Sequence, residues 1–211
     1  MELNDINRQM KKKQLTEQLL KSAFVDLILE NDGADAITVS EITDRADFNR
    51  GTFYIHYQNK SDLLEALYED AIGGIHQSIR QPYKDMDKVL VDGVIPSNEL
   101  IFEYIEANKK LFKALDLIEG DQDIYRRLES FLWNLFSKEI YVERESDTGE
   151  TEYELFLSFQ LHATVGVLKY WIKSDFIFST EVMNEQLTSF YTDKVIALHF
   201  NGHNLDEDQQ K

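Results

Sequence analysis

Residues 46–57 read Ala-Asp-Phe-Asn-Arg-Gly-Thr-Phe-Tyr-Ile-His-Tyr, and residues 59–62 continue Asn-Lys-Ser-Asp. Asn49 and Asn59 are of a residue type that caps helix N-termini, and Asp62 suits the first turn of a helix. The stretch therefore predicts a short helix over about 49–55, joined by a tight turn to the capped start of another helix. A short helix with basic, hydroxyl and aromatic side chains, held between two neighbours, is typical of one that enters the major groove of DNA.

Helical periodicity dominates the rest of the chain, and no long stretch alternates as a strand would. Thr38 or Ser40 caps a short second helix, Asn31-Asp32-Gly33 ends the first one, and a helix from Ser97 breaks near Asn108. The other expected helices cover about 11–31, 60–81, 122–142, 152–174 and 179–200. We therefore predict an all-α fold, with an N-terminal three-helix helix-turn-helix head and a C-terminal helical bundle that dimerises.

The 19-residue window 46–64 closely resembles the helix-turn-helix of the TetR family of one-component regulators, and residues 38–60 are interpreted as the DNA-reading segment. Asp47 stands where the family usually has glycine, and aspartate tolerates the left-handed backbone that such a turn needs. Phe48 replaces a small aliphatic residue and Asn49 replaces the usual serine. The likeness covers about residues 10–70 by motif and the remainder by architecture. A later stretch, 166–176, resembles the subgroup that contains dihydroxyacetone kinase operon activators.

Residue types and this resemblance together predict the DNA contacts. Arg50 and Thr52 open the recognition helix toward solvent, and an arginine fork on guanine gives ~1–3 kcal/mol of base discrimination. Phe53 and Tyr57 take inward positions and fill the core. Phosphate contacts are implied by the resemblance for Tyr54, His56, Lys60, Thr38 and Ser40, and a basic arm, Arg8 and Lys11–13, precedes the first helix. The expected DNA-contacting residues are Lys12, Lys13, Thr38, Ser40, Asn49, Arg50, Gly51, Thr52, Tyr54, His56 and Lys60.

The net charge of −17 opposes binding to phosphates, but it is unevenly distributed. Residues 1–62 carry 8 basic and 11 acidic residues, a net of −3, whereas residues 63–211 carry 14 and 28, a net of −14. Screening over ~8–10 Å lets a local basic face act despite a distant acidic body. We expect modest affinity for random DNA and a steep salt dependence. A head that is not basic overall also leaves open an acidic protein-interaction module with a non-functional head.

The long helix expected over 152–174 has two apolar stripes. One stripe packs on its own chain, and the other is most simply covered by the same helix of a second subunit. Complete burial within a single chain is the alternative. The residues expected at the dimer interface are Phe159, Ala163, Gly166 and Tyr170.

Aromatic residues are dense in the C-terminal part, where they form plain core or line a cavity for an amphipathic small molecule. The residues with which a cavity could hold an unknown small-molecule effector are Phe102, Tyr104, Tyr125, Trp133, Phe156 and His162.

Several function classes lose support from the sequence. Without cysteine, thiol catalysis and thiolate metal sites are excluded. The sequence holds no HExxH, Walker or dinucleotide motif, and no Glu stands three residues before a histidine. We therefore expect no catalytic residue, no metal and no cofactor, which makes an enzyme the weaker hypothesis. The first 13 residues are polar and no apolar run is long enough to cross a bilayer, so a cytoplasmic protein without membrane contact is expected.

The resulting hypothesis is a homodimeric transcriptional regulator of double-stranded DNA. Residues 1–60 form the DNA-binding head, residues 61–200 sense an effector and dimerise, and residues 201–211 form a polar tail. The head would read a pseudo-palindromic operator, with half-sites at least one helical turn apart, ~34–36 Å. Repression released by the effector is the expected output, and activation is the alternative.

Overall fold

The computed structural model describes residues 2–84, 86, 88, 96–120, 123–143 and 150–192 of the 211-residue chain. The described residues form α-helices and one short 3-10 helix, without a strand, so the predicted all-α class is confirmed. The polar tail and the end of the helix expected over 179–200 lie outside the described residues. The helices are α1 (Glu2–Glu30), α2 (Val39–Arg45), α3 (Arg50–His56), α4 (Lys60–Arg80), η1 (Gln81–Tyr83), α5 (Pro96–Ala107), α6 (Lys109–Asp116), α7 (Ile124–Lys138), α8 (Glu150–Lys173) and α9 (Thr180–Thr192).

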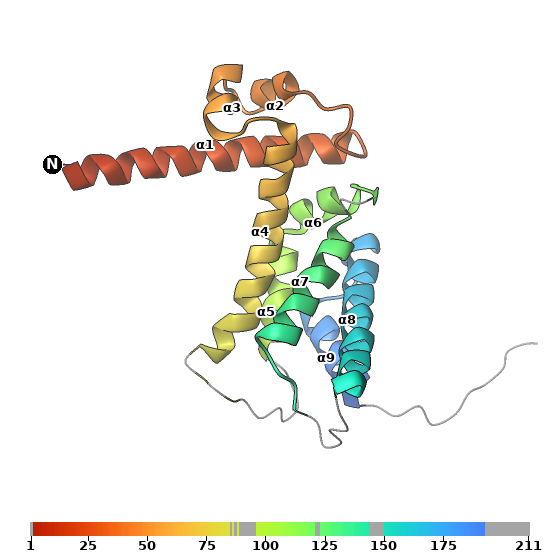
Figure 1. Cartoon of the computed structure of the whole chain (residues 1–211). Coiled ribbons are helices and arrows are strands. Elements are labelled where there is room, and N and C mark those ends of the chain that lie inside the picture. Colours follow the sequence, from red (N-terminus) through yellow and green to blue (C-terminus); the bar gives the residue numbers. More distant parts are fainter. Residues whose placement is uncertain are drawn as a thin grey trace, which may run out of the picture.

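The head consists of α1, α2 and α3, with the two short helices lying across the long one (Figure 1). Its core is a set of fully buried apolar side chains that includes Phe24 and Ile28 of α1, Ile42 of α2 and Phe53 of α3. Tyr57, directly after α3, is also buried, as predicted. The short helices α2 and α3 would not be stable alone. Burial of these apolar side chains away from water stabilises them against α1.

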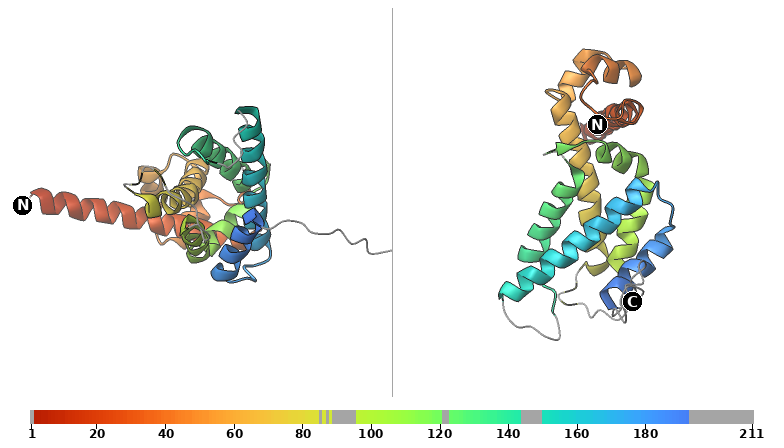
Figure 2. Two further views of the ribbon diagram at one scale, coloured as in Figure 1. Left: turned by 90° about the horizontal axis from the view of Figure 1, so that it is seen from below. Right: turned by 90° about the vertical axis from the view of Figure 1, so that its right-hand side faces the viewer.

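The expected start of the first helix near residue 11 is wrong, because α1 already begins at Glu2. No glycine or proline interrupts residues 2–30, so nothing in the sequence stops the helix from continuing toward the N-terminus. The helix consequently projects beyond the head as a rod (Figure 2, left). The basic residues Lys11–Lys13 lie on this rod rather than on an arm preceding the helix.

The body is joined to the head by α4, which runs from the head down into the bundle (Figure 1). One face of α4 is buried at helical spacing through Leu63, Leu67, Ala71 and Ile75. In the body α5 packs against α4 and α9, and α7 packs against α8. The head and the body share one continuous hydrophobic core. The angle between them is therefore set by packing as well as by the α4 connection.

Three local features fix how the body packs. The Tyr104 ring lies where a Cβ on Gly74 would meet it at 1.9 Å, so glycine is required for α4 and α5 to approach. The break predicted near Asn108 is confirmed, since α6 begins at the next residue. After α8 the chain turns through left-handed backbone at Asp175 and Phe176, with φ of 59° and 58°.

None of the described helices is long and apolar enough to span a membrane.

Candidate nucleic-acid interface

The first short helix of the head is held by a reciprocal cap. The backbone N–H of Glu41 donates to Thr38 Oγ1 at 3.3 Å, and the backbone N–H of Thr38 donates to Glu41 Oε2 at 2.7 Å. The Thr38 hydroxyl also donates to the same carboxylate at 2.7 Å. Hydrogen bonding by Thr38 holds the pKa of Glu41 below its ordinary value of 4.5. Thr38, expected at a phosphate, is thus committed to capping α2 here, and Ser40 beside it is half-buried.

The turn between α2 and α3 has left-handed backbone at Asp47, with φ of 57°. The prediction that aspartate would serve where the family has glycine is confirmed. Phe48 packs half-buried against the core, and its N–H donates to Thr43 O at 2.9 Å. The turn is therefore closed by a backbone hydrogen bond and anchored by an aromatic ring in place of a small aliphatic side chain.

The N-terminus of α3 is capped by Asn49, whose Oδ1 accepts from the Thr52 backbone N–H at 2.9 Å and from the Thr52 hydroxyl at 3.3 Å. The outward face beyond this cap carries Arg50, with its guanidinium 3.4 Å from the Tyr54 hydroxyl. Tyr54 is 51% exposed, and Gly51 is exposed between the two. Arg50, Gly51 and Tyr54 thus lie where a DNA groove could reach them, while Asn49 and Thr52 shape the helix end.

Two of the expected phosphate contacts, His56 and Lys60, point into the protein in this structure. The His56 side chain is 6% exposed, and its Nδ1 lies 3.1 Å from Glu17 Oε1 of α1. Lys60 Nζ donates to the carbonyls of Ala34 and Asp35 at 2.7 and 2.9 Å. These bonds fasten the end of α3 and the start of α4 to the first helix and to the loop after it. Lys12 and Lys13 on α1 are exposed, with Lys13 Nζ 3.8 Å from Glu17.

The sequence reasoning missed Ile55 and Glu17. Ile55 lies on α3 next to Tyr54 and is 78% exposed, the highest exposure among the large apolar side chains described. Counting along the helix from the inward Phe53 would have placed it outward. Glu17 joins α1 to His56, and such a long-range pair gives no signal in a single sequence.

The charges around α3 are mixed. Arg45 at the end of α2 donates two hydrogen bonds to Glu30 at 2.8 and 2.7 Å, a fork that lowers the pKa of the carboxyl. Asp44 and Asp47 are exposed at the turn beside α3. The exposed positive charge of Arg50 therefore follows a turn that carries exposed carboxylates, which agrees with a head that is not basic overall.

The six residues expected around an effector do not meet in one cavity. Phe102 is fully buried, edge-on to Trp171 at 5.4 Å between ring centroids. Tyr104 donates its hydroxyl to Asp70 O at 2.8 Å, and Tyr125 donates to Asp116 Oδ1 at 2.8 Å. Burial raises the pKa of Tyr125 above the ordinary range, and the hydrogen bond to Asp116 raises it further. Phe156 packs its ring near Tyr153 on α8.

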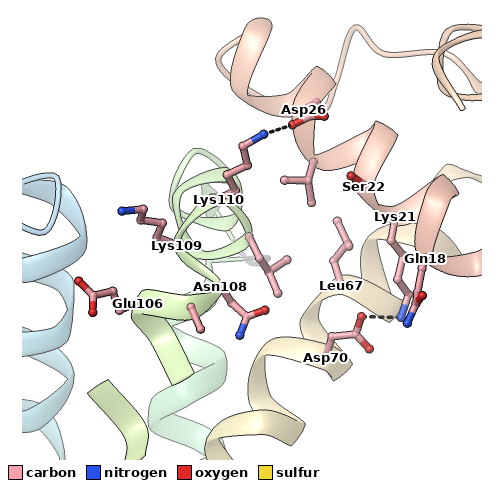
Figure 3. Close-up of a pocket in the computed structure, with 13 residues that line it drawn as sticks. Gln18, Lys21, Ser22, Asp26, Leu67, Asp70, Glu106, Asn108, Lys109 and Lys110 are labelled. Atoms are coloured by element: carbon pink, nitrogen blue, oxygen red, sulfur yellow. Dashed lines mark hydrogen bonds and ion pairs between the residues drawn. The ribbon is translucent and has the colours of Figure 1, made fainter. Parts of the chain in front are cut away.

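Trp133 and His162 do lie together, on the wall of an open depression of about 400 Å³ between α7 and α8. Another open hollow among the described residues is a groove of about 440 Å³ between the head and the body. Figure 3 shows ion pairs at this groove: Lys21 of α1 to Asp70 of α4 at 2.6 Å, and Lys110 of α6 to Asp26 of α1 at 2.9 Å. Val25 and Leu67 are among its apolar lining residues. Both hollows are open to solvent, and neither is enclosed in the bundle.

Helix α8 separates its two apolar stripes as the sequence indicated. The inner stripe is at most 7% exposed at Leu157, Leu161, Val165, Leu168 and Ile172. The outer stripe includes Leu155, Phe159 and Tyr170, which are 67%, 71% and 60% exposed, together with exposed Ala163 and Gly166. The alternative that α8 is buried on all sides within one chain is therefore wrong. A Cβ added at Gly166 would meet nothing within 4 Å, so packing within the chain does not require glycine there.

A capped short helix presented on a three-helix head, above a larger helical body, defines a helix-turn-helix protein. Residues 28–67 match the family model described as bacterial regulatory proteins, tetR family, and residues 95–193 match that of a transcriptional regulator C-terminal region. The chain belongs to the TetR family of transcriptional regulators, and so to a class of proteins that are not enzymes.

Individual relatives are distant. The chain is 25% identical over 183 residues to the HTH-type transcriptional regulator YxbF of Bacillus subtilis, covering 83% of this chain but 44% of that protein, so it spans less than half of this relative. It is 26% identical over 140 residues to the dhaKLM operon transcriptional activator DhaS of Lactococcus lactis, covering 65% and 68% of the two chains.

Two solved structures share the fold. Dihydroxyacetone kinase operon activator DhaS has a TM-score of 0.59 at 23% identity, over 83% of this chain and 93% of its own. A TetR regulator from Streptococcus agalactiae has a TM-score of 0.56 at 22% identity, over 88% and 98%.

Proposed function

We propose that this chain acts as a homodimer that reads a two-fold symmetric DNA operator through α3 and releases it when the body binds a small molecule. In this proposal residues 1–60 are the reading head and residues 61–200 the sensing and dimerising part. The observation that carries the dimer is the outer stripe of α8, whose phenylalanine, tyrosine and leucine side chains remain exposed although the same helix buries its opposite stripe.

The outer stripe fits a second copy of the same helix. Phe159 and Tyr170 supply large apolar surfaces, and Ala163 with Gly166 between them lets two backbones approach closely. In the right-hand view of Figure 2, α8 runs diagonally across the face of the body that is turned to the viewer, below the head. Phe190 of α9 is another large apolar side chain that is exposed, at 61%. A dimer joined here would hold two heads at a fixed separation.

The head–body groove suggests how the body would set that separation. The groove is spanned by the Lys21–Asp70 and Lys110–Asp26 pairs, both from α1 of the head to helices of the body. Arg127 of α7 also donates two hydrogen bonds of 2.7 and 2.8 Å to Glu65 of α4. A ligand that favours a different tilt of α4 would break such pairs and change the spacing of the heads. It would then shift the population toward a dimer that fits the operator less well.

We propose that the protein represses transcription and leaves its operator when the effector binds. Activation of transcription is the second candidate. The latter is favoured by the similarity to DhaS, which is named a transcriptional activator. A reporter with the operator placed upstream of, or overlapping, its promoter distinguishes the two: repression predicts higher expression when the gene for this chain is deleted, and activation predicts lower expression.

The proposal is tested by selecting duplexes from a random DNA library with the purified full chain. We expect a two-fold symmetric consensus and a complex that contains two chains per duplex. Phe159→Glu should yield monomers that lose the consensus duplex, whereas Leu15→Glu, on a similarly exposed aliphatic side chain of α1, should remain dimeric. Selection without a consensus, or a dimeric Phe159→Glu variant, would contradict the proposal.

A further inference from the structure

The outward face of α3 is continuous, and one member of it has no role in the fold. At about 100° per residue, Arg50, Tyr54, Gly51 and Ile55 fall on one arc of about 140°, opposite the fully buried Phe53. Ile55 lies at the end of this arc farthest from Arg50 and is 78% exposed. Gly51 lies between them without a side chain, so a flat partner could approach the backbone there and reach both flanking residues.

Folding does not explain an isoleucine at this position. Its side chain buries little surface, and isoleucine is a poorer helix former than alanine, lysine or glutamate. The core beneath α3 is already filled by Phe53, Tyr57 and the half-buried Phe48. An apolar side chain here costs helix propensity and solubility, and a partner that covers it would compensate for that cost.

The DNA major groove offers a matching apolar group, the C5-methyl of thymine. We propose that Ile55 is a specificity-determining residue that packs against a thymine methyl in each operator half-site, a step that rests on the proposed function. Arg50 on the same face supplies hydrogen bonds for a guanine. The two residues lie about a turn and a half apart along α3, so they would contact different base pairs of the same half-site. Each half-site then contains a guanine and a thymine read from one helix.

The contact is tested by removing only the methyl group from DNA. A consensus duplex selected with the full chain is resynthesised with deoxyuridine in place of each thymine in turn, with symmetric positions changed together. Deoxyuridine pairs as thymine does but lacks the C5-methyl, so hydrogen bonding is preserved. The wild type should lose about fourfold in affinity for each lost methyl contact, as expected for about 0.8 kcal/mol per buried methylene-sized group.

The variant Ile55→Ala completes the test, because alanine keeps the helix stable while withdrawing the methyl-packing surface. This variant should bind the thymine and deoxyuridine duplexes with equal affinity. That affinity should match the one that the wild type has for the deoxyuridine duplex. Leu15→Ala, which trims an exposed aliphatic side chain on α1, should keep the wild-type discrimination.

The outcomes separate this inference from the proposed function. A consensus duplex that binds equally well with every thymine replaced would overturn the role of Ile55 and leave the regulator intact. Methyl discrimination that survives in Ile55→Ala would also overturn it, because another residue would be reading the methyl. Absence of any consensus would remove the proposed function, and this inference with it.

Discussion

The outward faces of α3 and α8 are both exposed, but they differ in composition. The α3 face combines a guanidinium, a phenol, a glycine and an isoleucine, whereas the α8 face is a stripe of large apolar residues around Ala163 and Gly166. A mixed face suits the alternating donors, acceptors and methyl groups of base edges, and a mainly apolar face suits another protein surface. The two faces therefore predict separable effects: changes on α8 should act through assembly, and changes on α3 through base preference.

The largest expected effect comes from Gly166→Glu. A bulky charged side chain should separate the two α8 helices, giving a monomer in light scattering and a ~10²–10⁴-fold weaker operator complex, because bivalent binding is lost. Gly73→Glu is the matched control, since Gly73 is also a helical glycine where an added Cβ would meet nothing within 4 Å. A monomeric Gly73→Glu variant, or a dimeric Gly166→Glu variant with full affinity, would remove the distinction between the faces.

Arg50→Ala should have the next largest effect. Loss of a bidentate guanine contact costs about 1–3 kcal/mol, or about 5- to 150-fold per half-site, and should relax preference at one base position. The chain should remain dimeric. Fluorescence anisotropy with the consensus duplex and single-base variants measures both affinity and preference, and undiminished preference at every position would contradict the assignment.

Lys60→Ala should act mainly on stability. The ammonium caps the carbonyls of Ala34 and Asp35, and hydrogen bonds to a charged group contribute about 1.5–3 kcal/mol where they are shielded from water. Lys60 is half-buried, so a loss near the lower end of that range is expected in urea unfolding. Lys12→Ala, at an exposed site on α1, should leave stability unchanged and weaken all duplexes equally. A Lys60→Ala variant as stable as the wild type would contradict a stabilising role for these two hydrogen bonds.

Asp47→Asn separates charge from backbone conformation at the turn. Asparagine also tolerates the left-handed backbone, so the free energy of unfolding should stay within about 0.5 kcal/mol of the wild type. Removing a carboxylate beside α3 should strengthen binding to all duplexes a few-fold and more at low salt. Asp47→Ala, which does not suit φ of 57°, should lower stability by about 1 kcal/mol. Equal affinity of Asp47→Asn and the wild type at low salt would show that this carboxylate does not face the DNA.

Acidification should give the smallest effect. The pKa values of Glu30 and Glu41 lie below 4.5, so their stabilising contribution is complete above pH 4.5 and is lost as the pH falls through the lowered values. Glu30→Gln, which lacks the titrating group, should lose less stability between pH 6 and pH 3.5 than the wild type. Both tryptophans, Trp133 and Trp171, lie in the body, so tryptophan fluorescence follows the body, whereas far-UV circular dichroism follows the helices of head and body together.

The head was more predictable than the body because its determinants are local. Caps at Thr38, Asn49 and Asn59 and the left-handed Asp47 depend on neighbours within three or four residues, so the sequence indicates them directly. The inward turn of Lys60 depends on carbonyls 25 and 26 residues earlier in the chain, which no local pattern reports.

In the body, periodicity correctly identified the helices and the two faces of α8, but aromatic density did not identify a cavity. The Phe102 ring packs against Trp171, and the Tyr104 ring packs over Gly74, so neither ring lines a cavity in the described part of the chain. The same periodicity is compatible with a filled core or a hollow one, because the difference depends on how side chains from distant helices fit together.

The most direct test of the central claim is the mass and composition of the complex between the full chain and its selected duplex, measured by light scattering with separate protein and DNA absorbance. The account predicts two chains on one duplex, bound through α3, with the complex strongly weakened by Gly166→Glu and its base preference relaxed by Arg50→Ala. A single chain per duplex, or a complex indifferent to both substitutions, would contradict it.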